Sequence, residues 1–389
     1  MTDEKIQPFD SFSAVYKVLV WAGYYKLLNK PKNRCKWILH QIYRPIALMV
    51  AVGFNITHII FLIQVGSIST YKHVFENVLA GLVNLVVKIL TLNFHTPRID
   101  KLNKLLNDPI FAAYSKKDEE MLLDTKRNMH RLVRIMNISV TISIFFWPAS
   151  HFMRRYQDPT AVVTAYVPFE TNTWARFSYS VILEVIPVLW VGYGHLALDC
   201  VIATYYGQAE VQLKIVKYNL EHLFDTGGAT DGACDGGYCL YRDVIDKDLR
   251  NRFVHYLQRY EAIAWYTKEI GDVFNSSMSF QFFTSTATLC VVTYRMSSVS
   301  QLSYYSILQL VLSSCDYLQS DSVITSVYLS DWLSASPQFR RILLIAMLRW
   351  SSTLAPRVSG FVPLSLNTYV SILRSAYSLF AVLSTKQSE

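Results

Sequence analysis

Seven apolar runs, each long enough to cross a lipid bilayer, are the feature that most constrains how this chain can fold. They lie at about residues 38–65, 74–94, 132–152, 176–203, 271–293, 302–329 and 363–384. A helix needs about 20 mainly apolar residues to cross a hydrocarbon core about 30 Å thick. The composition agrees, since 52% of the residues are hydrophobic and only 17% are charged. We therefore predict an all-α membrane protein with seven transmembrane helices.

The loops between these runs are alternately rich and poor in lysine and arginine. The N-terminal tail, the second loop and the fourth loop each contain at least seven such residues, whereas the first loop has only Lys72 and the fifth only Arg295. Cytosolic loops of membrane proteins are enriched in Lys and Arg. We therefore predict a cytosolic N-terminus and an extracellular C-terminus, the reverse of a G-protein-coupled receptor. The net charge of +8 is then a mark of topology, and we expect no nucleic-acid partner.

Two segments outside the runs are also predicted to be helical. Apolar residues from Leu249 to Ala264 recur at helical spacing, which predicts one helix from about Lys247 into the fifth run. At about 1.5 Å per residue such a helix exceeds the membrane thickness, so its first half should project into the cytosol. The segment at 338–354 has too few apolar residues to cross, and Pro356, Gly360 and Pro363 separate it from the last run. We expect these parts to pack together as a cytosolic domain.

The last run carries an unusual stripe of hydroxyl residues. Positions three and four apart on one helix face are Thr368, Ser371, Ser375, Ser378, Val382 and Thr385. Small hydroxyl residues allow close contact between membrane helices, and they also suit a wetted pore wall, which a hydrophobic ring can gate. Arg374, at the edge of the stripe, either shapes an ion path or pairs with an acid such as Asp321 or Glu184.

The C-terminal third resembles the insect odorant receptor family. "CDYLQSDSVITSVYLSDW" (315–332) is similar to that family's sixth-span segment, and "LLIAMLRWSSTLAPRVSGFVPLSLNTYVSILRSAYSLFAVL" (343–383) is similar to its C-terminal signature. "VPFE" (167–170) echoes an element of the second outer loop. The related gustatory receptors have a Gln-Phe after the Thr-Tyr step, and Thr368-Tyr369 is followed by none. The fourth loop is much shorter than that of the family's obligate co-receptor, so the chain resembles the variable, ligand-recognising subunit.

This resemblance implies an odorant-gated, non-selective cation channel of four subunits, assembled with the olfactory co-receptor in the plasma membrane of an olfactory sensory neuron. It places the hydrophobic gate at Val382 and a polar pore position at Thr385, and it makes the cytosolic helices an anchor domain. The expected organisation is a cytosolic N-terminal segment (1–37), helices 1 to 4 with an outer ligand pocket (38–203), a cytosolic loop and helical extension (204–270), helices 5 and 6 (271–333), a cytosolic half-helix (334–356) and a pore-lining helix 7 (363–385).

A small volatile ligand requires an apolar, largely aromatic cavity with few polar groups. We expect it in the outer half of the bundle, where Trp147 resembles a pocket tryptophan of the family. The candidate lining residues are Phe75, Leu79, Val140, Ser143, Phe146, Trp147, Val181, Glu184, Val185, Val188, Tyr304 and Tyr305. Each of them could instead face lipid or the protein core. Towards the cytosolic end, His195 and Asp199 should pair with each other, and Asn77, Asn84 and Lys88 should face inward.

Three alternatives remain at this point. A seven-helix metabotropic chemoreceptor would need an extracellular N-terminus, and a gustatory-type receptor channel would share the same fold. An enzyme is not expected, because the sequence has no glycine-rich phosphate loop, no metal-ligand cluster and no nucleophile elbow. We expect no cofactor and no metal.

Overall fold

The computed structural model describes residues 7–27, 34–65, 84–159, 161–163, 165–223, 238–296, 337–350, 357–358 and 362–363, and the single positions 371, 374 and 378. The elements are η1 (Pro8–Phe12), α1 (Ser13–Trp21), α2 (Arg34–Val65), α4 (Asn84–Phe94), α5 (Thr96–Leu106), η3 (Pro109–Phe111), α6 (Lys116–Gln157), α7 (Trp174–Glu221), α8 (Tyr238–Met296), α11 (Pro337–Trp350), β1 (Arg357–Val358) and β2 (Val362–Pro363).

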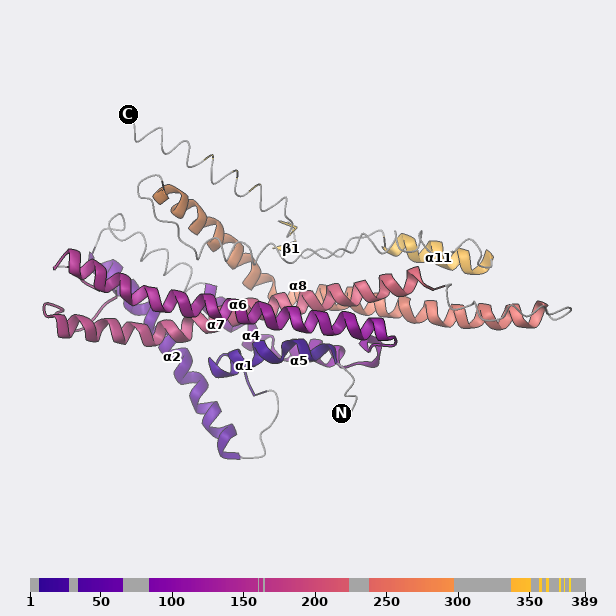
Figure 1. Ribbon diagram of the computed structural model, residues 1–389, viewed down its shortest axis with the longest axis horizontal. Coiled ribbons are helices and arrows are strands. Elements are labelled where there is room, and N and C mark those ends of the chain that lie inside the picture. Colours follow the sequence, from indigo (N-terminus) through magenta and orange to yellow (C-terminus); the bar gives the residue numbers. More distant parts are fainter. Residues whose placement is uncertain are drawn as a thin grey trace.

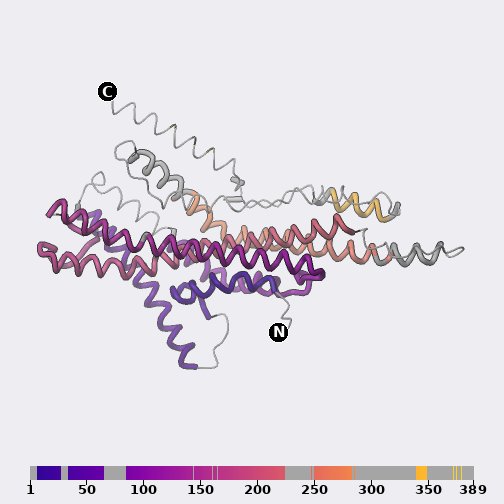
Figure 2. Tube along the Cα trace, in the orientation of Figure 1, coloured from indigo at the N-terminus to yellow at the C-terminus, as the bar shows by residue number. Residues whose placement is uncertain are grey.

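Three long helices give the molecule its long axis. α6 has 42 residues and α7 has 48, so at about 1.5 Å per residue they are roughly 63 and 72 Å long. They lie side by side with the first part of α8, whereas α2 crosses them at a steep angle (Figures 1 and 2). Within the described residues, α2, α6 and α7 are each long and apolar enough to cross a membrane. They contain the predicted runs at 38–65, 132–152 and 176–203.

Side-chain caps fix the starts of α6 and α7. Ser115 accepts a hydrogen bond from the backbone N–H of Asp118, whose carboxylate accepts in return from the backbone N–H of Ser115. Thr173 accepts from the backbone N–H of Arg176 at the start of α7. Such caps satisfy N–H groups that have no partner within the helix. The helix boundaries therefore follow from local sequence, although both helices extend well beyond the apolar runs.

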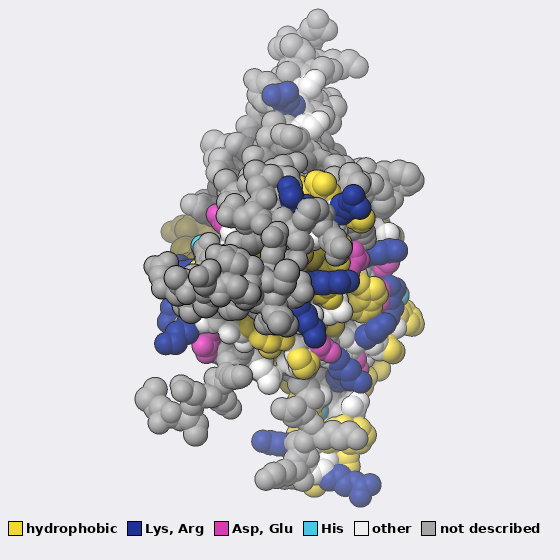
Figure 3. Space-filling view, turned by 90° about the vertical axis from the view of Figure 1, so that its right-hand side faces the viewer, with side chains coloured by type: hydrophobic (Ala, Val, Ile, Leu, Met, Phe, Trp, Pro, Cys, Tyr) yellow, Lys and Arg dark blue, Asp and Glu magenta, His cyan; other side chains and the backbone are white. Residues whose placement is uncertain are grey.

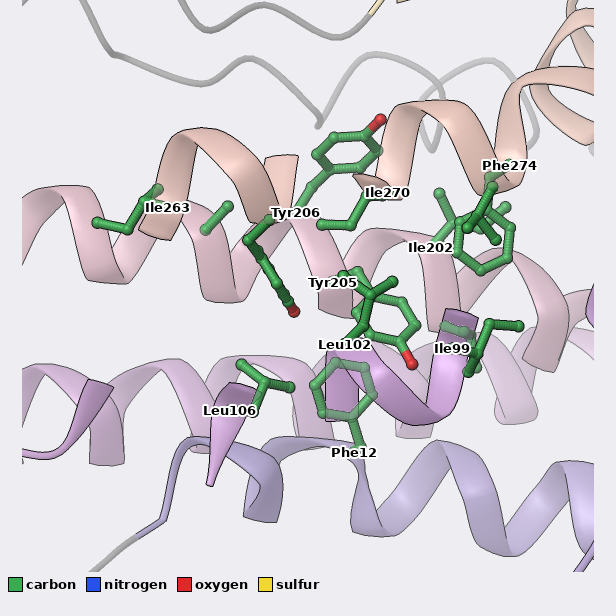
Figure 4. Packing of buried hydrophobic residues seen from close by; sticks show 14 of the residues in the cluster. Phe12, Ile99, Leu102, Leu106, Ile202, Tyr205, Tyr206, Ile263, Ile270 and Phe274 are labelled. Atoms are coloured by element: carbon green, nitrogen blue, oxygen red, sulfur yellow. The ribbon is translucent and has the colours of Figure 1, made fainter. Parts of the chain in front are cut away.

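The largest hydrophobic core lies where the N-terminal segment meets α5, α7 and α8. Figure 4 shows Phe12, Leu102, Tyr205 and Phe274 converging from these elements. In contrast, the apolar part of α6 leaves large side chains uncovered, among them Phe145, which is 72% exposed. A densely packed half and a half with an apolar surface are typical of a membrane protein with a water-exposed helical domain.

Two elements differ from the sequence-based expectations. The fifth run does belong to one continuous helix, but α8 begins at Tyr238 and not near Lys247. The described elements are otherwise helical, as expected for an all-α chain, with one short exception after α11, where β1 and β2 pair antiparallel. Pro356 precedes β1 and Pro363 ends β2, and proline lacks the N–H that a helix interior requires. α11 is described over Pro337–Trp350, and the expected helix end at residue 354 lies outside the described residues.

The predicted sixth run, 302–329, lies outside the described residues, as do most of the seventh run and the first half of the second. Of the second run, α4 covers Asn84–Phe94.

Candidate functional site

The described part of the expected ligand site comes from α6 and α7. Val140 of α6 is buried against α7, where its Cγ1 would lie 3.3 Å from a Cβ placed on Gly192. Val181 is buried in a small cluster with Val163 and Phe177, and Val185 packs against it. Phe146 is 64% exposed. Trp147 and Val188 are half-buried on α6 and α7.

Several expected site residues cannot be placed. Phe75, Leu79, Tyr304 and Tyr305 of the ligand site, and Thr368, Ser375, Val382 and Thr385 of the pore, lie outside the described residues. Ser143 lies within α6, but its side chain is outside the described part. Ser371, Arg374 and Ser378 are helical and exposed.

A buried polar cluster joins α2, α6 and α7. The Nε2 atom of His58 on α2 lies 3.2 Å from Oε1 of Glu184 on α7, and both side chains are at most 4% exposed. The other ring nitrogen of His58, Nδ1, is 2.9 Å from the carbonyl oxygen of Phe54. His151 of α6 interacts electrostatically with both residues, and its ring contacts that of Trp147 with centroids 4.6 Å apart. Glu184, a candidate ligand-site residue, is thus buried in the bundle beside His58.

His58 and His151 were not identified from sequence. Each lies in a long apolar run among other scattered polar residues, a pattern that also fits a histidine bonded only to its own helix. Because α2 crosses α7 at an angle, the contact between His58 and Glu184 depends on helix packing and not on sequence spacing.

A second buried cluster joins α4 to α7. Lys88 forms an ion pair with Asp199, and His195 Nε2 lies 3.7 Å from the other carboxylate oxygen. The expected pairing of His195 with Asp199 is confirmed, but Lys88 is the closer partner. Lys88 is 2% exposed, as expected for an inward-facing residue. A charge buried between apolar helices is stable only when it is paired in this way.

Arg155 holds the connection between α6 and α7. Its guanidinium donates to the carbonyl oxygens of Ala161, Thr171 and Asn172 at 2.8, 3.1 and 2.9 Å. It also lies over the ring of Phe177, 5.2 Å from the centroid. A single side chain thus fixes both ends of this loop next to the small apolar cluster of Val163, Phe177 and Val181.

In the densely packed half, Arg259 of α8 is buried, and none of its hydrogen bonds to described residues is to a carboxylate. It donates to Gln212 Oε1 at 2.6 and 3.1 Å and to the carbonyl oxygens of Phe111 and Ala112. Burial lowers the pKa of Arg259 to about 10. The sequence indicated only a cation of the fourth loop at this position, because its partners, Gln212 and two backbone carbonyls, lie on other elements.

Surface cavities lie beside the N-terminal segment. One of about 490 Å³ runs along η1 and α1 and is lined by Phe9, Tyr16 and Trp21. Another, of about 460 Å³, lies between Pro8 and the segment from Leu106 to Glu119. Neither contains a residue of the expected ligand site.

Membrane-length helices that continue into a packed helical domain, with ionisable side chains paired between apolar helices, define a multi-pass membrane protein of the receptor or transporter type. The chain belongs to the odorant receptor family, because a family model described as "7tm Odorant receptor" matches residues 76–377. The resemblance noted in the C-terminal third is thereby confirmed, as is the expectation of a receptor and not an enzyme.

Individual relatives are distant. "Putative odorant receptor 92a" of Drosophila melanogaster is 24% identical over 278 residues, which cover 67% of this chain and 65% of the relative. "Odorant receptor 19a" and "Putative odorant receptor 19b" of the same species are 24% identical over 144 residues, 33% of this chain and 37% of each relative. The alignments thus span between about a third and two thirds of these relatives.

Solved structures show the same fold. The insect olfactory receptor OR5 from Machilis hrabei matches with a TM-score of 0.76 and 16% identity, over 95% of this chain and 96% of its own. The complex of OR5 with eugenol matches with a TM-score of 0.75. The bundle and the packed domain described above therefore have the architecture of an insect olfactory receptor.

Proposed function

We propose that this chain is the ligand-recognising subunit of an odorant-gated, non-selective cation channel. It binds a small volatile compound in the outer half of the helical bundle and opens a central pore in a tetramer with the olfactory co-receptor. The main support is the match over 95% of the chain to an olfactory receptor that has been solved with eugenol. The plasma membrane of an olfactory sensory neuron is the expected location.

Modest affinity follows from the size of such a ligand. Burial of about 250 Å² of apolar surface at about 25 cal/mol per Å² contributes roughly 6 kcal/mol. That corresponds to a dissociation constant in the tens of micromolar. A directional contact, where one exists, adds selectivity to this apolar contribution.

The last helix is the proposed pore wall. Ser371, Arg374 and Ser378 are exposed on it, which supports a role for this face in contacts outside the single chain. Arg374 does not pair with Glu184, whose ionic partner is His58. We place Thr368, Ser371, Ser375, Ser378 and Thr385 on the wall and Val382 at the gate.

Expression of this chain with and without the co-receptor tests the proposal. Odorants should evoke a cation current only when both chains are present, and Val382→Lys should change ion permeation because it places a charge in the proposed gate. Val370→Lys, on a different face of the same helix, is the matched control and should leave the permeability ratio unchanged. Absence of current across a broad odorant panel, with both chains at the cell surface, would refute the channel assignment.

A further inference from the structure

The close approach of His58 and Glu184 indicates that one of the two facing groups is protonated. His58 Nδ1 lies 2.9 Å from the carbonyl oxygen of Phe54, which can only accept, so Nδ1 carries a hydrogen. In a neutral ring, Nε2 then presents a lone pair, and Glu184 Oε1 is only 3.2 Å away. Two acceptors do not approach each other in this way. One proton must therefore lie on Nε2 or on the carboxyl group, and in either case the pair has no net charge.

Glu184 has acceptor capacity that the described residues do not use. Both of its carboxyl oxygens are buried and neither accepts a hydrogen bond from a described group, because the His58 contact has the distance but not the geometry of one. The side chain is only 3% exposed. Buried carboxyl oxygens in proteins nearly always have a donor. Among the described residues, the cluster therefore lacks a hydrogen-bond donor to Glu184 Oε2.

The surroundings of the pair are aromatic and aliphatic. The ring of Phe54 lies 4.5 Å from that of His58, and the ring of Trp147 lies 4.6 Å from that of His151. Val181 and Val185 stand beside Glu184 on α7, and both belong to an apolar cluster. A few polar atoms among apolar side chains are typical of sites for small organic molecules.

We propose that the Glu184–His58 pair is the polar end of the odorant site and selects neutral ligands that carry a hydroxyl group. The ligand O–H donates to Glu184 Oε2. An ammonium ligand fits poorly, because the pair is already neutral and a further positive charge would be buried without a counter-ion. A hydroxyl group supplies the donor and adds no charge. This inference rests on the proposed function, since it assigns the ligand chemistry of the same receptor.

Matched ligand pairs test this selectivity. Para-cresol and hexanol, each beside its own methyl ether, would be titrated into the purified full-length chain and followed by its thermal unfolding temperature. The ether is larger by one CH₂ group and has no O–H to donate. Because a hydrogen bond contributes about 0.5–1.5 kcal/mol, and about 1.5–3 kcal/mol when the acceptor is charged, each alcohol should bind about two- to a hundredfold more tightly than its ether. Equal binding of alcohol and ether, or no binding of either alcohol, overturns the proposal.

Two variants assign the preference to Glu184. Glu184→Gln keeps the shape but leaves one amide oxygen, a weaker acceptor, in place of the two carboxyl oxygens, and it should lower the alcohol-to-ether ratio. Ser180→Ala is the matched control: Ser180 is buried one turn away, its hydroxyl donates to the Arg176 carbonyl, and its removal should leave the ratio unchanged. A ratio in Glu184→Gln equal to that of the wild type contradicts the assignment.

A spectroscopic measurement on the wild-type chain keeps the test valid if Glu184→Gln does not fold. Bound para-cresol should shift a carboxyl or carboxylate stretching band in the infrared difference spectrum, whereas its methyl ether should not. If para-cresol and its methyl ether give the same infrared difference spectrum, the inference is refuted. Neither assay measures current, so a chain that binds alcohols through Glu184 but conducts nothing contradicts only the channel function. Odorant-evoked current without a hydroxyl preference contradicts only this inference.

Discussion

Tyr16, Asn103 and Tyr205 form a closed ring of hydrogen bonds in the main core. Tyr205 donates to Asn103 Oδ1 at 2.7 Å, Asn103 donates to the Tyr16 oxygen at 3.2 Å, and the two phenol oxygens are 2.9 Å apart. The ring links the N-terminal helix α1 to α5 and α7. Burial raises the pKa of Tyr16, so the phenol stays protonated and can donate.

Tyr16→Phe should destabilise the protein by about 1–3 kcal/mol, because it removes the acceptor of the buried Asn103 amide N–H and one of the two hydrogen bonds of the Tyr205 hydroxyl. Thermal unfolding of the purified chain measures the effect. Tyr24→Phe is the control, since the Tyr24 hydroxyl makes only a 3.4 Å contact with the Trp190 carbonyl. A larger loss from Tyr24→Phe than from Tyr16→Phe would contradict the importance of the ring.

An ion pair between α5 and α8 predicts a dependence on acid pH. The Arg98 guanidinium, 2.6 Å from Glu269, holds the pKa of that carboxyl below its ordinary value of 4.5. The stabilisation is therefore complete above about pH 4.5 and is lost as the pH falls through the lower folded pKa. Glu269→Gln should cost at most about 1 kcal/mol near neutral pH, because Arg98 is partly exposed.

The measurement is the unfolding temperature of the wild type and of Glu269→Gln as a function of pH. The difference in unfolding temperature between the wild type and Glu269→Gln should disappear in acid. The control Glu119→Gln, which removes an exposed carboxylate, should unfold at the same temperature as the wild type at every pH. A difference that grows as the pH falls would refute the assignment.

Residue-level contacts could be predicted from sequence only where one helix supplied both partners. His195 and Asp199 were found because they are four residues apart on α7. Lys88 was expected to face inward, but its partner could not be named, since that depends on how α4 packs on α7. For the same reason, the contacts of His58, His151 and Arg259 could not be predicted, since their partners lie on other elements.

At the level of elements, α8 shows how far helical periodicity can be followed. Its 59 residues link the packed domain to the predicted fifth span, and the apolar spacing after Leu249 indicated this continuity. Its start was misplaced, because the glycine-rich stretch before it has no periodic pattern. The hairpin of β1 and β2 was expected only as a break, since proline excludes a helix without specifying what replaces it.

A glycine within α8 gives a test of this helix. A Cβ added at Gly271 meets no atom within 4 Å, so Gly271→Ala should stabilise the protein by about 0.5–1 kcal/mol through the higher helix propensity of alanine. Gly194→Ala should destabilise it, because the new Cβ would lie 1.9 Å from the Tyr24 ring. Unfolding temperatures of both variants check the prediction, and a destabilising Gly271→Ala would contradict the open surroundings of that position.

At the level of the whole molecule, Figure 3 shows Lys and Arg side chains at the end of the packed domain that faces the viewer. The sequence predicted a charged helical domain next to the apolar spans, because the loops that form it are rich in Lys and Arg. It did not predict how α2 crosses the bundle, which depends on contacts between distant segments.

The predicted orientation places this charged end in the cytosol. An epitope tag before residue 1 should therefore be inaccessible to antibody in intact cells and become accessible on permeabilisation, whereas a tag after residue 389 should be accessible in both. The C-terminal tag is the internal control for surface expression. An N-terminal tag stained in intact cells would instead favour the metabotropic receptor.

The bonds that Arg155 makes have a consequence for how such a protein can diverge. All three of its acceptors are main-chain carbonyls, which every amino acid possesses. Substitutions along the connection between α6 and α7 can therefore change its side chains while leaving the path of the chain intact. One arginine would thus hold the backbone of this connection in place while its side chains diverge between related proteins.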